Sequence, residues 1–193
     1  KAFGMYRRVL FILVFGFSLF TNSAPAQNLD SLYSVWQDET KPDSTRVAAY
    51  KDYIWKGFLF SQPDSAFTLA DAFIAYGQKN QYPKAEAQAY NTQGASFYLQ
   101  GNYLKALDYY QRSLKIREEI GDKKGMASSM NNIGLIYRRQ GDYPQALNYY
   151  LRSLKIREEI GDKKEIAAPL NNIGIIYYDQ GNYPKALDYY ERS

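Results

Sequence analysis

The chain has 193 residues, of which 46% are hydrophobic, enough for one domain of ordinary size. It contains no cysteine and no histidine, so disulfides, thiolate nucleophiles, Cys/His zinc sites and imidazole-based triads are excluded, and we expect no metal and no cofactor. The net charge is +4, but three of the basic residues, Lys1, Arg7 and Arg8, lie in residues 1–26, which hold no acidic residue. The remainder of the chain therefore has a net charge of +1. This charge is too small to predict nucleic-acid binding.

The N-terminal segment, residues 1–26, has the pattern of a signal peptide. "MYRR" supplies positive charge, "VLFILVFGFSLF" (9–20) is an apolar core, and "SAPAQ" contains an A-x-A site, which predicts cleavage after Ala26. The apolar run is shorter than the roughly 20 residues of a membrane-spanning helix. An uncleaved anchor or a buried helix stays open. We expect export, with the remainder in the bacterial periplasm or anchored outside the cytoplasm.

The next segment and the two chain ends are less patterned. We interpret residues 27–42 as a linker that leads into the repeats described below. The chain starts at Lys1 although Met5 is a plausible start, and Ser193 falls inside a repeated pattern. We therefore expect a fragment of a longer protein.

A sequence period of about 40 residues, in the range typical of stacked arrays, dominates the rest of the chain. Residues 101–140 match 141–180 at about two thirds of positions, 181–193 begin another copy, and 61–100 keep the spacing with weaker identity. We predict such an array over residues 43–193, with units of about 43–80, 81–120, 121–160 and a truncated 161–193.

Each unit has the pattern of two helices. In residues 141–160, apolar side chains recur at three- and four-residue steps, as on one face of a helix. Gly141 can end the preceding helix in the left-handed conformation, Asp142 can cap the next, and Pro144 fits its first turn. The same pair of roles is predicted for Gly121 with Asp122 and for Gly161 with Asp162.

The string "NNIGLIYRRQGDYPQALNYYLRSL" resembles a tetratricopeptide repeat (TPR). Its family positions are Gly134, Tyr137, Gly141, Tyr143 and Ala146, then Gly174, Tyr177, Gly181, Tyr183 and Ala186, with Gly94 one unit earlier. The resemblance implies an all-α solenoid, a right-handed superhelix of antiparallel helix pairs. The period is longer than the roughly 34 residues that are common in this family. It resembles the long repeats of kinesin light chains and of exported TPR regions in bacterial signalling proteins.

The charged string "SLKIREEIGDKK" occurs at residues 113–124 and again at 153–164. It covers the end of a helix, a turn and the start of the next helix. The adjacent Glu118 and Glu119 point about 100° apart around a helix, so they do not form a convergent catalytic pair. We interpret the string as a solvated joint between repeats, and we predict no catalytic residue.

Paired asparagines stand in the first helix of each later unit. The resemblance implies that Asn132 and Asn172 are structural and that Asn131, Asn171 and their counterpart Asn91 face a concave groove. Amide side chains both donate and accept, so a ladder of them could hold the backbone of an extended peptide. The alternative, that these asparagines are solvated or locally bonded, stays open.

The other predicted groove positions differ between copies, as expected if a ligand rather than packing selects them; they are Tyr98, Leu135, Arg138, Arg139, Ile175 and Tyr178. Arg138 and Arg139 could receive an acidic side chain or a terminal carboxylate, although ordinary surface charge is the alternative. Pro169 cannot lie deep inside a helix, so the helix there either begins near Ala167 or bends.

The predicted function is protein or peptide binding without catalysis. The resemblance favours the exported sensory or interaction region of a larger bacterial signalling protein, with a histidine kinase, nucleotide cyclase or transcription regulator as output. The alternative is a stand-alone exported adaptor for assembly or secretion. An enzyme is the least favoured class. We expect no contact of the array with nucleic acid or membrane, and self-association stays open.

Overall fold

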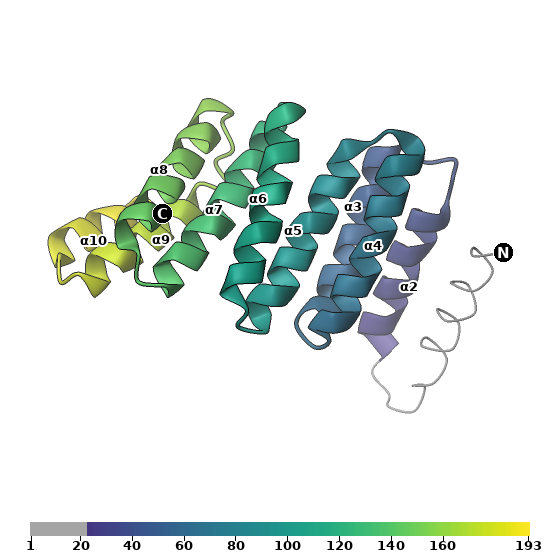
Figure 1. Cartoon of the computed structure of the whole chain (residues 1–193), viewed down its shortest axis with the longest axis horizontal. Helices are drawn as coiled ribbons and strands as arrows, with labels where there is room; N and C mark the ends of the chain where they lie inside the picture. Colours follow the sequence, from purple (N-terminus) through teal and green to yellow (C-terminus); the bar gives the residue numbers. More distant parts are fainter. Residues whose placement is uncertain (1–22) are drawn as a thin grey trace.

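The structure, a computed structural model, describes residues 23–193, and this part of the chain is all-α (Figure 1). Consecutive helices pack as antiparallel neighbours in a row from α2 to α10. The elements are α2 (Ser23–Gln37), α3 (Asp43–Ile54), a π-helical turn (Trp55–Leu59), α4 (Pro63–Asn80), α5 (Pro83–Leu99), α6 (Tyr103–Glu119), α7 (Lys123–Arg139), α8 (Tyr143–Glu159), α9 (Ala167–Asp179) and α10 (Tyr183–Glu191).

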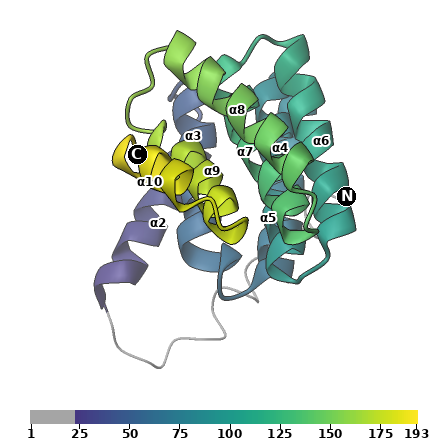
Figure 2. The same ribbon diagram turned by 90° about the vertical axis from the view of Figure 1, so that its left-hand side faces the viewer.

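The row of helices is twisted. Viewed from its end, α9 and α10 run across the direction of α5 and α6, with α8 at an intermediate angle (Figure 2). Each pair is therefore rotated relative to the one before, as in a solenoid of stacked repeats.

The turns between helices follow the predicted chemistry. Gly141 has φ +79° and ends α7, and the Asp142 side chain accepts a hydrogen bond from the Gln145 N–H at 3.1 Å. Pro144 lies in the first turn of α8, where its missing N–H costs nothing. Asn102, Asp122 and Asn182 cap their helices in the same way. These caps explain why helix ends recur with the sequence period.

The start of α9 departs from this pattern and corrects the role predicted for Asp162. Its carboxylate accepts from Arg157 at 3.2 Å instead of capping a helix, and α9 begins only at Ala167. In the unit before, Gly125 occupies the corresponding turn, and a Cβ there would lie 2.7 Å from the Arg117 side chain. Glu165 stands at this position in the later turn, and its Oε2 lies 3.7 Å from the Arg157 Nη1. Of the two predictions for Pro169, a helix starting near Ala167 is confirmed.

The family glycines pack directly against tyrosine rings. A Cβ added to Gly134 would lie 2.7 Å from the ring of Tyr150. The corresponding pairs are Gly94 with Tyr110 and Gly174 with Tyr190. The alanines one turn before these tyrosines are also buried, namely Ala106, Ala146 and Ala186. The two helices of each unit are therefore held at a separation that only glycine permits.

In the first unit, the large and the small side chain at these positions are exchanged between the two helices. At the positions one period before Gly94 and Tyr110 stand Ile54 and Ala70, both fully buried in one cluster. The large side chain has moved to the first helix and the small one to the second. The volume between the helices is thus conserved by a different pair of residues.

Residues 27–42, predicted to be a linker, are largely helical and packed. The ring of Trp36 on α2 stacks on Tyr50 with centroids 4.4 Å apart, and the Arg46 Nε donates to the Trp36 carbonyl at 2.9 Å. α2 lies one period before α4, so it occupies the place of the second helix of a preceding unit. The predicted cleavage site after Ala26 falls within α2, whereas residues 1–22 lie outside the described residues.

Candidate peptide-binding face

The first helices of the later units, α5, α7 and α9, are joined by their asparagines. The Asn132 Nδ2 donates to the Asn91 Oδ1 at 2.9 Å, and the Asn172 Nδ2 donates to the Asn131 Oδ1 at 3.0 Å. The second asparagine of each pair therefore binds the first asparagine of the preceding unit. This agrees with the structural role predicted for Asn132 and Asn172, and it places the three helices side by side.

The same bonds change the interpretation of the predicted asparagine ladder. Asn91 is only 5% exposed and its oxygen is occupied, so it contacts the neighbouring unit and not a ligand. Asn131 is half-buried and its oxygen is also occupied, whereas Asn171 is exposed. The sequence could not reveal this, because each amide finds its partner 41 residues away. Of the three, Asn171 is the one whose side chain is open to a ligand.

The remaining predicted positions lie along the same three helices, and we call this surface the α5/α7/α9 face. Its half-buried members are Tyr98, Asn131, Leu135, Arg138 and Ile175, and its exposed members are Arg139, Asn171 and Tyr178. Leu135 and Ile175 correspond to each other one unit apart. The face thus carries asparagine and apolar side chains at mid-helix and changes to arginine or tyrosine in the last helical turn.

Two arginines at the end of α7 interact with tyrosines of two different units. The Arg139 Nε donates to the Tyr98 hydroxyl at 3.1 Å, and this bond raises the pKa of Arg139. Burial raises the pKa of Tyr150 to about 12, and the positive charge of Arg138 beside it partly offsets that shift. Arg138 and Arg139, predicted from sequence alone, are therefore brought together with Tyr98 and Tyr150.

The sequence interpretation missed a buried arginine in the repeated charged string. Arg117 is 5% exposed and its Nη1 donates to the Gly125 carbonyl at 2.6 Å; Arg157, its counterpart, is 3% exposed. The string is therefore not solvated throughout, which corrects the prediction. The signal was present in the spacing, because Arg117 follows the buried Tyr110 by seven residues and Leu114 by three, on one helical face.

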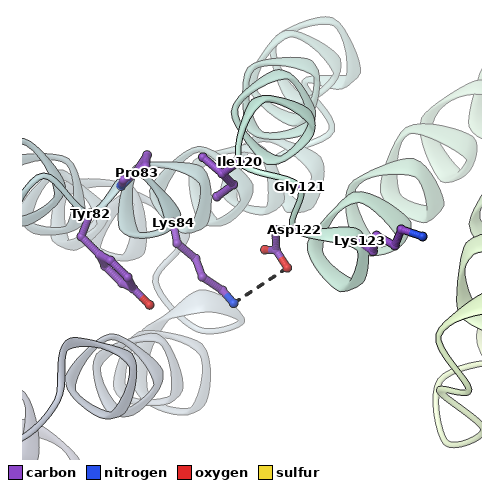
Figure 3. Close-up of a pocket in the computed structure, with 7 residues that line it drawn as sticks. All are labelled: Tyr82, Pro83, Lys84, Ile120, Gly121, Asp122 and Lys123. Atoms are coloured by element: carbon purple, nitrogen blue, oxygen red, sulfur yellow. Dashed lines mark ion pairs between the residues drawn. The ribbon is translucent and has the colours of Figure 1, made fainter.

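A shallow pocket of about 430 Å³ lies where this string ends (Figure 3). Figure 3 shows Lys84 reaching from α5 toward Asp122, and the Lys84 Nζ lies 3.8 Å from the Asp122 Oδ1. The other lining residues are Tyr82, Pro83, Ile120, Gly121 and Lys123. The carboxylate of the pocket is thus already paired and also caps α7. Its residues lie at the joint between two repeats, and none belongs to the α5/α7/α9 face.

Residues 23–193 offer neither a membrane span nor an acidic metal site. No helix there is both long enough and apolar enough to cross a membrane. That part of the chain also contains no cluster of three or more acidic side chains able to hold a metal ion.

The fold and the face define a helical-repeat interaction scaffold. Residues 85–159 and 125–193 match the model of the tetratricopeptide repeat family, and together these matches cover more than half of the chain. The chain belongs to the tetratricopeptide repeat family. Domains of this family typically act as non-catalytic scaffolds that bind proteins or peptides. A search of curated protein sequences gave no match.

Solved structures share the fold at low sequence identity. Aspartyl phosphate phosphatase F from Bacillus subtilis is 19% identical with a TM-score of 0.69, over 86% of this chain and 46% of that one. BtubC from P. vanneervenii is 19% identical with a TM-score of 0.64, over 88% and 70%. MamA is 17% identical with a TM-score of 0.55, over 90% and 94%. At these identities the similarity concerns the fold alone.

Proposed function

We propose that this chain is an interaction scaffold whose α5/α7/α9 face binds a segment of a partner protein. The observation that carries the proposal is the contrast between two sets of positions. The glycine–tyrosine contacts inside units two to four are the same in each unit, whereas the face changes from unit to unit. Packing accounts for the constant set. A ligand that meets each unit at a different point of its own length accounts for the variable set.

The chemistry of the face suits an extended segment or a partner helix. Leu135 and Ile175 offer half-buried apolar contact at corresponding points of α7 and α9, and the exposed Asn171 can both donate and accept. Tyr98 and Tyr178 supply aromatic surface beyond them. Such a row of side-chain contacts matches the ways in which helical grooves recognise peptides.

Photo-crosslinking tests the face directly. Benzoylphenylalanine would replace Leu135 or Ile175 in separate variants, and irradiation of intact cells should attach a partner protein at both positions. Matched controls carry the same group at Leu104 or Leu151, which are 77% and 45% exposed but lie on α6 and α8. Equal crosslinking at all four positions, or at the controls alone, would contradict the assignment.

The proposal extends to cellular role and location. The N-terminal pattern of charge, apolar core and A-x-A site supports export, and the long repeats resemble exported regions of bacterial signalling proteins. In this role, partner binding outside the cytoplasm is reported to a kinase, a nucleotide cyclase or a transcription regulator. The repeat family supports a binding role without catalysis.

Two measurements separate this role from its alternatives. Mass spectrometry of the mature protein from the periplasmic fraction should find an N-terminus at Gln27; an intact N-terminus in a cytoplasmic fraction would contradict export. Sequencing the gene beyond codon 193 should find a membrane helix and an output domain. A stop codon after one or two further repeats would instead support a stand-alone adaptor.

A further inference from the structure

Four side chains meet at the end of α7 and form what we call the arginine cluster: Arg138, Arg139, Tyr98 and Tyr150. Arg139 donates to Tyr98 at 3.1 Å, and its guanidinium also lies 6.0 Å from the centroid of that ring. Arg138 lies beside the Tyr150 hydroxyl. The Arg138 Nε and the Tyr150 hydroxyl oxygen are buried without a well-formed hydrogen bond. The cluster thus holds two positive charges, and the buried Arg138 Nε and Tyr150 hydroxyl face each other rather than solvent.

The chain does not neutralise these two charges. In the described residues, no carboxylate lies within 4.0 Å of Arg138 or Arg139, whereas Arg112 on α6 pairs with Asp108 at 2.9 Å. Asp179 on α9 comes 41 residues after Arg138, just as Arg139 comes 41 residues after Tyr98. Arg139 and Tyr98 form a hydrogen bond, but in the described residues Asp179 and Arg138 form no ion pair. Two neighbouring guanidinium groups without a carboxylate partner favour the binding of an anionic ligand.

Helix stability does not require the arginines. Cations at a helix C-terminus interact favourably with the macrodipole, which is the alternative explanation. However, α5 ends with Tyr98–Leu99 and α9 with Tyr178–Asp179 at the corresponding positions, and both helices form. The charge is therefore specific to the third unit. Asn91 and Asn131 at mid-helix are occupied by the asparagines of the next unit, whereas this last turn carries both charged side chains of the α5/α7/α9 face.

We propose that the partner segment carries adjacent carboxylate side chains that bind the arginine cluster, so that the scaffold selects an acidic stretch. The inference rests on the proposed binding face. The two guanidinium groups each donate to a carboxylate, and the Tyr98 hydroxyl, which accepts from Arg139, donates to a remaining oxygen. Leu135 and Ile175 contact the apolar residues that follow in the segment. Specificity comes from the two arginines of this one unit and not from the asparagine row.

NMR of the arginine side chains tests the proposal in the full 193-residue chain. The probe is the capped peptide acetyl-Ala-Ala-Glu-Glu-Ala-Ala-amide, and its partner has Gln-Gln in place of Glu-Glu. The Glu-Glu peptide should shift the Nε–Hε signals of Arg138 and Arg139 and bind at least about tenfold more tightly, because charge-assisted bonds are about twice as strong as neutral ones. The difference should shrink as salt is raised.

A charge-matched pair of variants locates the effect. Arg138→Gln with Arg139→Gln should abolish the preference for Glu-Glu. Arg112→Gln with Arg152→Gln removes the same charge from exposed positions of α6 and α8 and should leave the preference intact. Equal loss in both variants would mean that net charge, and not the cluster, attracts the peptide, and would overturn the proposal.

The remaining outcomes separate this inference from the proposed function. If the two peptides bind equally or not at all, while crosslinking at Leu135 still captures a partner, the acidic preference is wrong and the binding face stands. If a phosphoserine version binds and the Glu-Glu peptide does not, the ligand is a phosphopeptide and the carboxylate proposal fails.

Discussion

At the scale of single residues, Arg117 shows how a charged side chain can hold the array together from inside. Its Nη1 donates to the Gly125 carbonyl at 2.6 Å and to the Ser129 hydroxyl at 3.2 Å, and its Nη2 lies 3.5 Å from the Gln88 oxygen. One guanidinium therefore joins α6 to α7 and α5. Burial lowers the pKa of Arg117 to about 10, so the group stays charged at neutral pH.

Replacing Arg117 by lysine keeps the positive charge but removes the branched guanidinium group, whose two terminal nitrogens reach acceptors on α7 and α5. We expect Arg117→Lys to lower the free energy of unfolding by about 1–3 kcal/mol, because a single ammonium cannot reach acceptors on two other helices. Urea denaturation measures the change. Arg112→Lys, at an exposed position on the same helix, should change stability by less than about 0.5 kcal/mol. Equal effects of the two substitutions would show that the branched guanidinium group of Arg117 contributes nothing to the free energy of unfolding.

The glycine–tyrosine contact predicts an unusual response to alanine. Glycine to alanine in a helix ordinarily stabilises by about 1 kcal/mol, but the new methyl group of Gly134→Ala would lie 2.7 Å from the Tyr150 ring. We therefore expect a loss of about 1–3 kcal/mol in urea denaturation.

The matched double variant copies the first unit, where Ile54 and Ala70 occupy these positions. Gly134→Ile combined with Tyr150→Ala should be clearly more stable than the sum of the two single changes predicts. Strict additivity would show that the two positions do not share one packed volume.

At the scale of elements, α2 closes the first end of the described array. Its Trp36 packs between Tyr50 on α3 and Tyr76 on α4, with ring centroids 4.4 and 4.7 Å away. Leu29, on the same helix, contacts the cluster around Ile54. These contacts cover the apolar surface that the first helix pair would otherwise expose, which is the role of a capping element in a repeat array.

Truncating the tryptophan tests that role. We expect Trp36→Ala to lower the free energy of unfolding by about 3–5 kcal/mol, the usual cost of emptying a large aromatic site. Phe60→Ala removes another aromatic side chain, 75% exposed, and should have little effect. Hydrogen exchange should locate the loss of protection in α2, α3 and α4. Unchanged stability of the tryptophan variant would mean that the segment behaves as the linker first predicted.

At the scale of the whole molecule, buried tyrosine hydroxyls are spread along the array. Burial raises the pKa of Tyr50 and Tyr110, and it raises the pKa of Tyr150 to about 12. Burial and a hydrogen bond to Asp43 raise the pKa of Tyr76 to about 12 as well. These residues lie in the first three units, so alkaline pH acts on most of the array at once.

The sign of the pH dependence follows from these shifts. The folded protein keeps each tyrosine protonated in a range where the unfolded chain has released the proton. The stabilisation is therefore complete below pH 10 and is lost as pH rises from about 10 to 12. Urea denaturation should show a decrease approaching about 1.4 kcal/mol per pH unit for each such tyrosine. Tyr150→Phe should reduce the slope, and a flat profile would show that the hydroxyls ionise in the folded state.

The sequence by itself determined the repeating part of this protein. The long sequence period, the glycine and cap residue of turns such as Gly141–Asp142, and the spacing of apolar side chains predicted the helix pairs over residues 43–193. These features are local in the sequence, so they recur in each copy of the repeat. The family positions at Gly134 and Ala146 were predictable for the same reason, since each of these residues makes a contact inside one unit.

Only the tertiary structure decided which side chains remain open to a ligand. Whether Asn91 is free depends on Asn132, and whether Arg139 is free depends on Tyr98, each 41 residues away. The packing of α2 depends on aromatic residues of α3 and α4, and the burial of Arg117 depends on acceptors in two other helices. Burial and hydrogen bonding are properties of neighbours in space, and a repeat pattern does not specify how successive units satisfy one another's polar groups.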